Sequence, residues 1–261
     1  MRSTNFLVKQ STTKLRIDKL LLDRGLATSR ERAQALVLAG KVLVNGQKIE
    51  KAGAAVDASA EIRLLGDDLK YVSRGGLKLE RALEHWNIDV RDRICLDVGA
   101  STGGFTDCLL QHGAARVIAI DTGQGQIAFR FRQDPRVRLL EKTNARYLIR
   151  EQLGETANFI AIDVSFISAT LVLPAVVAAA FPADPVERAG RELVVMVKPQ
   201  FEVGREQVAK GGIVRDSQAQ QSALEKVKSA VQHLRPSVID AIDSPILGAE
   251  GNREFLLYAR F

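Results

Sequence analysis

Four charged residues could carry out acid–base chemistry, three of them at the edges of apolar runs typical of β-strands. They are Lys78, Asp163, Lys198 and Glu254. Asp163 ends the run FIAIDV and Lys198 ends VVMVK, whereas Glu254 opens the last apolar run. A charge at the end of a buried strand needs a partner or a function. We therefore take these two lysines and two carboxylates as the candidate catalytic set, with Glu250 as a nearby alternative to Glu254.

A glycine loop supplies the second chemical signal. The sequence DVGASTGGF follows an expected strand over 93–98, and its pattern D-x-G-x-x-x-G lacks the G-x-G-x-x-G of dinucleotide sites. The loop resembles motif I of S-adenosylmethionine-dependent methyltransferases with a Rossmann-like fold. Asp121 ends the next expected strand, where an acid can accept hydrogen bonds from both hydroxyls of a ribose. The candidate cofactor-binding residues are Asp97, Gly99, Ser101, Gly103, Asp121 and Asn144.

Two roles are open for Asn144, the last residue of the candidate cofactor-binding set. It is expected at the end of the third strand, where it could face the adenine edge of a nucleoside. Asparagine also caps turns, and this alternative stays open.

The elements that must position these residues alternate along the second part of the chain. Short apolar runs over 93–98, 117–121, 159–164 and 193–198 are separated by helical patterns such as 167–180 and 218–233. Two late runs, 238–241 and 254–261, would complete the sheet. This alternation predicts an α/β domain with a doubly wound parallel sheet over 77–261. In such a sheet ligands bind beyond the carboxyl ends of the strands.

The first third of the chain is a different kind of module. Residues 1–81 hold 16 lysines and arginines against 9 acids, whereas the other 180 residues are almost neutral. We expect a flexible arm over 1–14, a small α+β unit over 15–66 and a linker over 67–76. Thr28-Ser29 is a plausible helix N-cap, and Asn45-Gly46 between apolar runs predicts a hairpin. Concentrated positive charge of this kind indicates a polyanionic partner.

The basic module resembles the S-four RNA-binding domain. The matching features are Arg16-x-Asp18, Gly25-Leu26-Ala27, Ser29-Arg30 and the pattern G-x-V-x-V-N-G over 40–46. Arginines near a helix start suit phosphate contacts, and folded RNA is read largely through its shape and backbone. A solvated surface is the alternative for each charge. The candidate RNA-binding residues are Arg16, Lys19, Arg30, Arg32, Lys41, Arg74 and Lys210.

Six further motifs make the resemblance specific. SRGGLKL, DVGASTGGFTDCLL, AIDVSFIS, VKPQFEVGR, KGGIVRD and GNREF together resemble the TlyA family over residues 15–261, in the family's order. The resemblance implies an S-four domain joined to an RrmJ-like methyltransferase domain. It also implies a Lys-Asp-Lys-Glu tetrad at the four charged positions and transfer to a cytidine 2′-hydroxyl. The implied substrate is large-subunit ribosomal RNA and, in some members, small-subunit ribosomal RNA too, within ribosomal subunits.

The chemistry of that reaction agrees with the tetrad. A ribose hydroxyl must lose its proton as it attacks the methyl group, and the sulfonium already activates that methyl, so no metal is required. A free lysine has a pKa near about 10.4, which burial or a neighbouring cation would lower. We assign Lys198 as the base, with Lys78 lowering its pKa and Asp163 orienting it. Glu254 would hold Lys78 or the ribose.

Two other residues could recognise an extruded base. Chemistry on a nucleotide often requires the base to leave its stack, and Phe105 and Phe201 could then pack against it. Core packing is the alternative for both.

Composition limits the remaining possibilities. Two cysteines make neither a disulfide framework nor a metal cluster, and no residue set has metal-ligand spacing. No secretory signal or membrane-spanning run is visible, which favours a cytoplasmic protein. The rivals are an RNA-binding protein with a silent methyltransferase fold and a membrane-active hemolysin. Failure to bind the cofactor would favour the first, and leakage of liposomes would favour the second.

Overall fold

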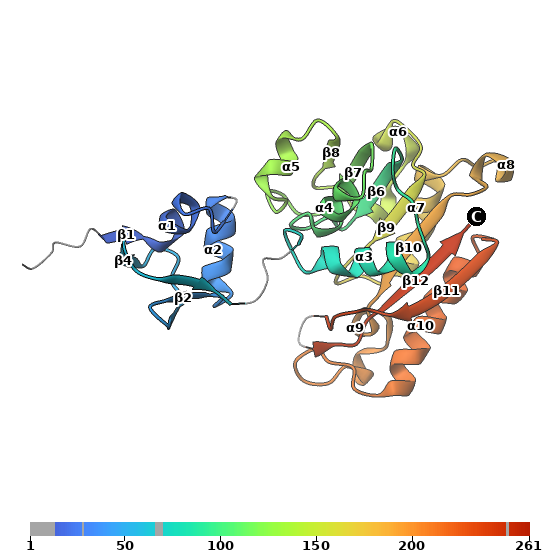
Figure 1. The fold of residues 1–261 in the computed structure, drawn as a ribbon. Coiled ribbons are helices and arrows are strands. Elements are labelled where there is room, and N and C mark those ends of the chain that lie inside the picture. The colour runs from blue at the N-terminus through green and yellow to red at the C-terminus, as the bar shows by residue number, and fades with distance from the viewer. Residues whose placement is uncertain (1–13, 28, 66–69, 249–250) are drawn as a thin grey trace, which may run out of the picture. The chain divides into compact units, whose positions relative to one another are not determined.

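The computed structural model describes residues 14–27, 29–65, 70–248 and 251–261. The chain divides into two compact units, 1–69 and 70–261, each of which is described below by itself (Figure 1).

The N-terminal unit packs two helices on short strands. Its strands are β1 (Lys14–Arg16), β2 (Val42–Val44), β3 (Gln47–Ile49), β4 (Ala55–Asp57) and β5 (Ile62–Leu64), and its helices are α1 (Ile17–Asp23) and α2 (Arg30–Leu38). β1 pairs with β4, and β2 lies between β3 and β5, always antiparallel. Buried aliphatic side chains from both helices and from β2 form one core.

Local signals in this unit agree with its structure. Ser29 Oγ accepts a hydrogen bond from the backbone N–H of Arg32 at 3.1 Å, which confirms the expected cap. Asn45 and Gly46 both have positive φ, as a two-residue hairpin turn requires, and they join β2 to β3. One expectation is wrong by a residue: Lys14 already pairs with Asp57 in β1. Residues 1–13 of the expected arm lie outside the described part.

The C-terminal unit is built on a seven-stranded sheet in the order β11-β12-β10-β9-β6-β7-β8. The strands are β6 (Ile94–Val98), β7 (Arg116–Ile120), β8 (Val137–Leu140), β9 (Phe159–Ile162), β10 (Glu192–Val197), β11 (Val238–Asp243) and β12 (Phe255–Arg260). β6 lies between β7 and β9 and is parallel to both, so the strand order reverses there. The crevice at such a reversal is where ligands bind in this fold class.

Helices cover both faces of this sheet (Figure 1). One core cluster joins α3 (Gly75–His85), α4 (Gly104–Gln111) and α5 (Phe129–Gln133) to one face. The other cluster joins α6 (Arg150–Leu153), α7 (Leu173–Ala180) and α10 (Ser217–Gln232) to the opposite face. The shorter helices are α8 (Pro185–Arg188), α9 (Pro199–Glu202), η1 (Ala145–Tyr147), η2 (Ala169–Leu171) and η3 (Arg205–Gln207). The expected α/β fold is thus confirmed.

Three details differ from expectation. The sheet is not wholly parallel, because β12 runs antiparallel to both neighbours, β10 and β11. The helix expected over 167–180 is divided into η2 and α7, since Pro174 lacks an N–H and lies in the first turn of α7. Finally, the expected linker over 67–76 includes structured residues. Tyr71 is buried in the core of this unit, and α3 begins at Gly75.

Candidate active site

The four candidate catalytic residues gather at one edge of the sheet. Asp163 directly follows β9 and Lys198 directly follows β10, so both stand at the carboxyl ends of neighbouring parallel strands. Glu254 precedes β12, which is antiparallel, and therefore its first residue pairs with the last residue of β10. Lys78 comes from the first turns of α3. The antiparallel strand is thus what brings the fourth charge to this edge.

The tetrad is arranged as two ion pairs. Lys78 Nζ contacts the Glu254 carboxylate, and Lys198 Nζ lies 2.6 Å from Asp163 Oδ1. Lys198 Nζ also donates to Ser165 Oγ at 2.8 Å. Lys78 and Lys198 are each 8% exposed and Glu254 is 3% exposed, so the charges are largely removed from water. Pairing compensates a desolvation cost that would otherwise be prohibitive.

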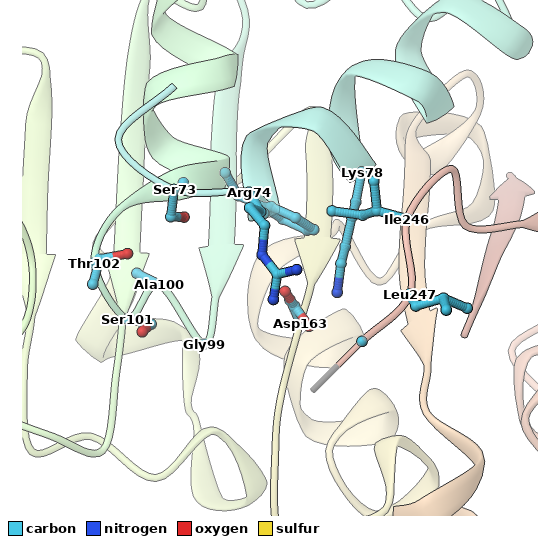
Figure 2. A pocket seen from close by; sticks show the side chains of 14 residues that line it. Ser73, Arg74, Lys78, Gly99, Ala100, Ser101, Thr102, Asp163, Ile246 and Leu247 are labelled. Carbon is cyan, nitrogen blue, oxygen red and sulfur yellow. The ribbon is translucent and has the colours of Figure 1, made fainter. Parts of the chain in front are cut away.

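A cavity of about 260 Å³ adjoins these pairs (Figure 2). Lys78 and Asp163 belong to its wall, together with the start of α3, the glycine loop and residues 246–248. Figure 2 shows the side chains of Arg74 and Lys78 pointing from the start of α3 toward Asp163. One member of each ion pair, Lys78 or Asp163, therefore lines the same space as the glycine loop.

Gly99 lets two strand ends approach each other closely. It follows β6 with a φ of +87°, and a Cβ at this position would lie 2.5 Å from the carbonyl oxygen of Asp163. A side chain here would be strained both by the left-handed backbone and by contact with the segment that carries Asp163. The glycine thus sets the spacing between the loop and Asp163.

We expect Gly99→Ala to weaken S-adenosylmethionine binding about tenfold or more, because strain of about 1–3 kcal/mol must be relieved by moving the loop. Isothermal titration of the full chain measures this. Gly190→Ala is the matched control, since Gly190 also has a positive φ, +78°, but no atom lies within 4 Å of its Cβ position. Equal affinity losses in both variants would contradict the role of close approach.

Asp121, which directly follows β7, binds the backbone of the glycine loop. Its Oδ2 accepts the backbone N–H of Ser101 and its Oδ1 accepts that of Gly123, both at 2.7 Å. Each carboxylate oxygen keeps further acceptor capacity, so ribose hydroxyls could still bind. Gly103 follows in the same loop with a φ of +96° and precedes α4.

Asp97 lies beneath the loop rather than in the cavity wall. It is wholly buried, and its Oδ2 accepts a hydrogen bond from Thr106 Oγ1 at 2.6 Å, which ties β6 to α4. Burial raises the pKa of this carboxyl to about 7. The structure therefore supports a positioning role for Asp97, in place of the direct cofactor contact that we expected.

We expect this carboxyl to make stability depend on pH. Between the ordinary carboxyl range near 4 and about 7, the unfolded chain releases the proton whereas the folded chain keeps it. The free energy of unfolding of the wild type should therefore fall with rising pH relative to Asp97→Asn, and the difference should level off above about 7. Urea unfolding followed by fluorescence of Trp86, the one tryptophan, measures it. A difference independent of pH would contradict the prediction.

Asn144 does not end a strand, which corrects the expectation. β8 ends at Leu140, and Asn144 Oδ1 instead accepts the backbone N–H of Arg146 at 3.0 Å as the cap of η1. The alternative of a turn-capping asparagine describes this contact.

The candidate RNA-binding residues differ in their surroundings. In the N-terminal unit, Asp18 is fully buried and accepts hydrogen bonds from Arg16 Nε at 3.0 Å and from Arg30 Nε at 3.2 Å. The guanidinium of Arg16 holds the pKa of Asp18 well below its usual range. Both arginine side chains remain about half exposed. Of the other candidates, the exposed ones are Lys19, Arg74 and Lys210, and the half-buried ones are Arg32 and Lys41.

Sequence reasoning gave no role to Asp18, Ser165 or Phe166, although Asp18 belongs to the quoted pattern Arg16-x-Asp18. Asp18 organises two candidate arginines, and Ser165 contacts the proposed base. Phe166 is 92% exposed with a φ of +64°, and its ring lies 5.3 Å from that of Phe201. The sequence did offer one signal for Phe166, because it lies three residues after the candidate catalytic residue Asp163. Phe105, by contrast, is 3% exposed and packs in the core, as the alternative interpretation expected, although it also borders the cavity.

Neither metal-ligand clusters nor membrane spans are found within the described ranges. There, no group of three or more His, Cys, Asp or Glu side chains is placed to hold a metal ion. No helix in those ranges combines the length and apolar character needed to cross a bilayer. Glu250, the alternative to Glu254, lies outside the described part of the chain.

Comparison with known proteins agrees with this geometry. Residues 71–261 match the model of the FtsJ-like methyltransferase family, and residues 15–62 match the S4 domain. The fold and site thus define an S-adenosylmethionine-dependent methyltransferase carrying an S4 domain.

Similar proteins show to which family within this class the chain belongs. The Mycobacterium tuberculosis protein named 16S/23S rRNA (cytidine-2′-O)-methyltransferase TlyA is 44% identical over 94% of this chain and 89% of its own. Bacillus subtilis YqxC, which carries an rRNA methyltransferase name, is 43% identical over 95% and 86%. A solved Streptococcus thermophilus structure with a hemolysin name has a TM-score of 0.70 at 44% identity, covering 96% of this chain and 89% of that one. The chain belongs to the TlyA family, as the motifs predicted.

Proposed function

We propose that this enzyme transfers the methyl group of S-adenosylmethionine to the 2′-hydroxyl of a cytidine in ribosomal RNA within ribosomal subunits, in the cytoplasm. The observation that carries the proposal is the shared cavity, whose wall holds the glycine loop together with Lys78 and Asp163, one member of each lysine–carboxylate pair. The names of the M. tuberculosis and B. subtilis relatives support the ribosomal substrate.

The cavity residues fit the cofactor. Gly99 lines the cavity and lets the glycine loop lie close to Asp163. Asp121 directly follows β7 and accepts the N–H of Ser101, which lines the cavity, and a carboxylate at this position of the fold can hold a ribose. Ser101 and Thr102 line the same wall and offer hydroxyls. When bound, S-adenosylmethionine supplies a methyl group already activated by the sulfonium charge.

Lys198 is the proposed proton acceptor. The attacking hydroxyl becomes more nucleophilic as its proton leaves, and a neutral amine at Lys198 Nζ would take that proton. Asp163, 2.6 Å away, and Ser165, 2.8 Å away, fix the direction of the amine. Asp163 belongs to the cavity wall, so it links the lysine to the reacting space. Once protonated, the ammonium is stabilised by the Asp163 carboxylate.

Lys78 and Glu254 are proposed to orient the ribose. Lys78 lines the cavity and is held by Glu254, so a donor is fixed beside the hydroxyl that must be aligned with the methyl group. Glu254 therefore holds Lys78, one of the two roles considered from the sequence. The expected effect of Lys78 on Lys198 stays a prediction.

The N-terminal unit is proposed to bind RNA through its phosphate backbone. Arg16 and Arg30 share the buried Asp18 and keep exposed guanidinium faces. Because Asp18 limits the motion of both side chains, less entropy is lost when a phosphate binds.

We expect Arg30→Gln to weaken binding of ribosomal subunits and to reduce the dependence of log Kd on log salt by about one. Filter binding across a salt series measures both quantities. Lys48→Gln is the matched control, because it removes one exposed charge from β3 of the same unit. Equal effects of the two substitutions would show that net charge alone matters.

The proposed function is tested by incubating purified ribosomal subunits with the full chain and methyl-labelled S-adenosylmethionine. Label on a cytidine ribose supports the proposal and identifies the subunit. Cofactor binding without label on either subunit would contradict the substrate. Absence of cofactor binding would favour the silent-fold rival, and leakage of liposomes would favour the hemolysin.

A further inference from the structure

A basic loop leaves the catalytic edge and returns to α10. It runs over 203–216, between α9 and α10, and contains η3 and the isolated bridge between Ala209 and Ile213. Three basic side chains are exposed along it, Arg205, Lys210 and Arg215, against two exposed acids, Glu206 and Asp216. Because α9 directly follows Lys198, this loop brings positive charge close in sequence to the catalytic strand.

Asn252 ties the tip of this loop to the opposite segment. It is 2% exposed, and its side chain makes two complementary hydrogen bonds. Nδ2 donates to the carbonyl oxygen of Gly212 at 2.8 Å, and Oδ1 accepts the backbone N–H of Val214 at 3.0 Å. An amide offers a donor and an acceptor side by side, so it can satisfy both backbone groups at once.

The same residue also shapes the segment that carries Glu254. Its backbone oxygen accepts the N–H of Gly248 at 2.8 Å. Gly248 lies in the cavity wall and packs so closely against the Glu254 carboxylate that a Cβ there would overlap it. Glu254 in turn holds Lys78. One buried asparagine therefore contacts both the basic loop and the support of the catalytic pair.

We propose that Asn252 is a positioning residue that couples the basic loop to the Lys78–Glu254 pair. The inference rests on the proposed function, since it takes RNA as the polyanion that engages Lys210 and Arg215. RNA bound along the loop would fix Gly212 and Val214, and through Asn252 it would fix Gly248 and the carboxylate of Glu254. The ribose-orienting lysine would then be held most rigidly when substrate is present.

Gln220 provides a matched control for simple loop anchoring. From α10 its Nε2 donates to the carbonyl oxygen of Val214 at 2.7 Å, and the residue is 9% exposed. It therefore ties the same loop to the fold, but from the side of α10. Loss of this bond should loosen the loop at Val214 and leave the two hydrogen bonds from the Asn252 side chain to Gly212 and Val214 in place.

The test compares methyl transfer to ribosomal subunits by the wild type, Asn252→Ala, Gln220→Ala, Glu254→Gln and the double variant Asn252→Ala/Glu254→Gln. We expect Asn252→Ala to lower kcat by about 10- to 100-fold, the cost of a misplaced catalytic group. Gln220→Ala should raise KM for subunits and change kcat little. The double variant should be no slower than Glu254→Gln alone, because residues that act through one another are not additive.

Several outcomes would overturn the inference. They are an unchanged kcat in Asn252→Ala, an equal loss of kcat in Gln220→Ala, or a full additional loss in the double variant. Cofactor titration and the thermal midpoint verify that each variant is folded. If the alanine variant does not fold, Asn252→Asp replaces it. Aspartate keeps the size of the side chain but places an acceptor against the carbonyl oxygen of Gly212, so kcat should fall as expected for alanine. A normal kcat in Asn252→Asp would also overturn the inference. Failure of the wild type to label RNA would instead refute the proposed function.

Discussion

Lys198→Arg should lose about 10²- to 10⁴-fold in kcat, nearly as much as Lys198→Ala, because arginine cannot give up its proton in a protein. The substitution keeps a positive charge that can still pair with Asp163, 2.6 Å from the native amine. The substitution therefore distinguishes two roles for Lys198, that of a proton acceptor and that of a cation that only neutralises the Asp163 carboxylate. Single-turnover transfer of labelled methyl groups to subunits measures the loss.

The pH profile gives a second view of the same role. A base that must be neutral makes the rate of the chemical step increase with pH until the amine is deprotonated, and Lys198→Arg should remove that limb. Lys226→Arg is the control, because Lys226 pairs with Glu202 from α10. Substantial activity in Lys198→Arg, together with an inactive Lys78→Arg, would transfer the role of base to Lys78, which itself lines the cavity.

The sequence predicted which edge of the sheet carries the candidate catalytic residues, because strand ends are marked by local patterns. Asp163 and Lys198 directly follow apolar runs, and parallel strands bring their carboxyl ends to one edge. Glu254 was expected at the start of the last strand, but the direction of that strand, which brings Glu254 to the same edge, is set by its pairing with β10 and β11. Local patterns carry no information about that pairing.

Contacts between residues far apart in the chain could not be predicted from the sequence for the same reason. The pairing of Lys78 with Glu254 spans 176 positions, and no spacing rule connects them. Asp97 was misjudged because its motif indicates closeness to the cofactor loop but not burial beneath it. Asn144 was misplaced because β8 ends at Leu140, four residues before the position at which we expected the third strand to end. Boundaries of elements depend on tertiary packing more than their existence does.

Removal of one partner from the Lys78–Glu254 pair should destabilise the C-terminal unit strongly. Glu254→Ala leaves the ammonium of Lys78, whose side chain is 11% exposed, without its carboxylate, and we expect a loss of about 3–5 kcal/mol in the free energy of unfolding. The double variant Lys78→Met/Glu254→Leu should recover most of this stability, because neither apolar side chain needs a partner. Urea unfolding followed by Trp86 fluorescence reports this unit, since Trp86 stacks on Tyr258 of β12.

Activity should not follow stability in this series. The apolar double variant should fold and bind S-adenosylmethionine, yet transfer methyl groups at least about 10²-fold more slowly, because the donor that orients the ribose is gone. Recovery of activity together with stability would show that the pair is only a structural element. A Glu254→Ala variant as stable as the wild type would show that water reaches Lys78. It would contradict the view that the Lys78–Glu254 pair is rigid and desolvated.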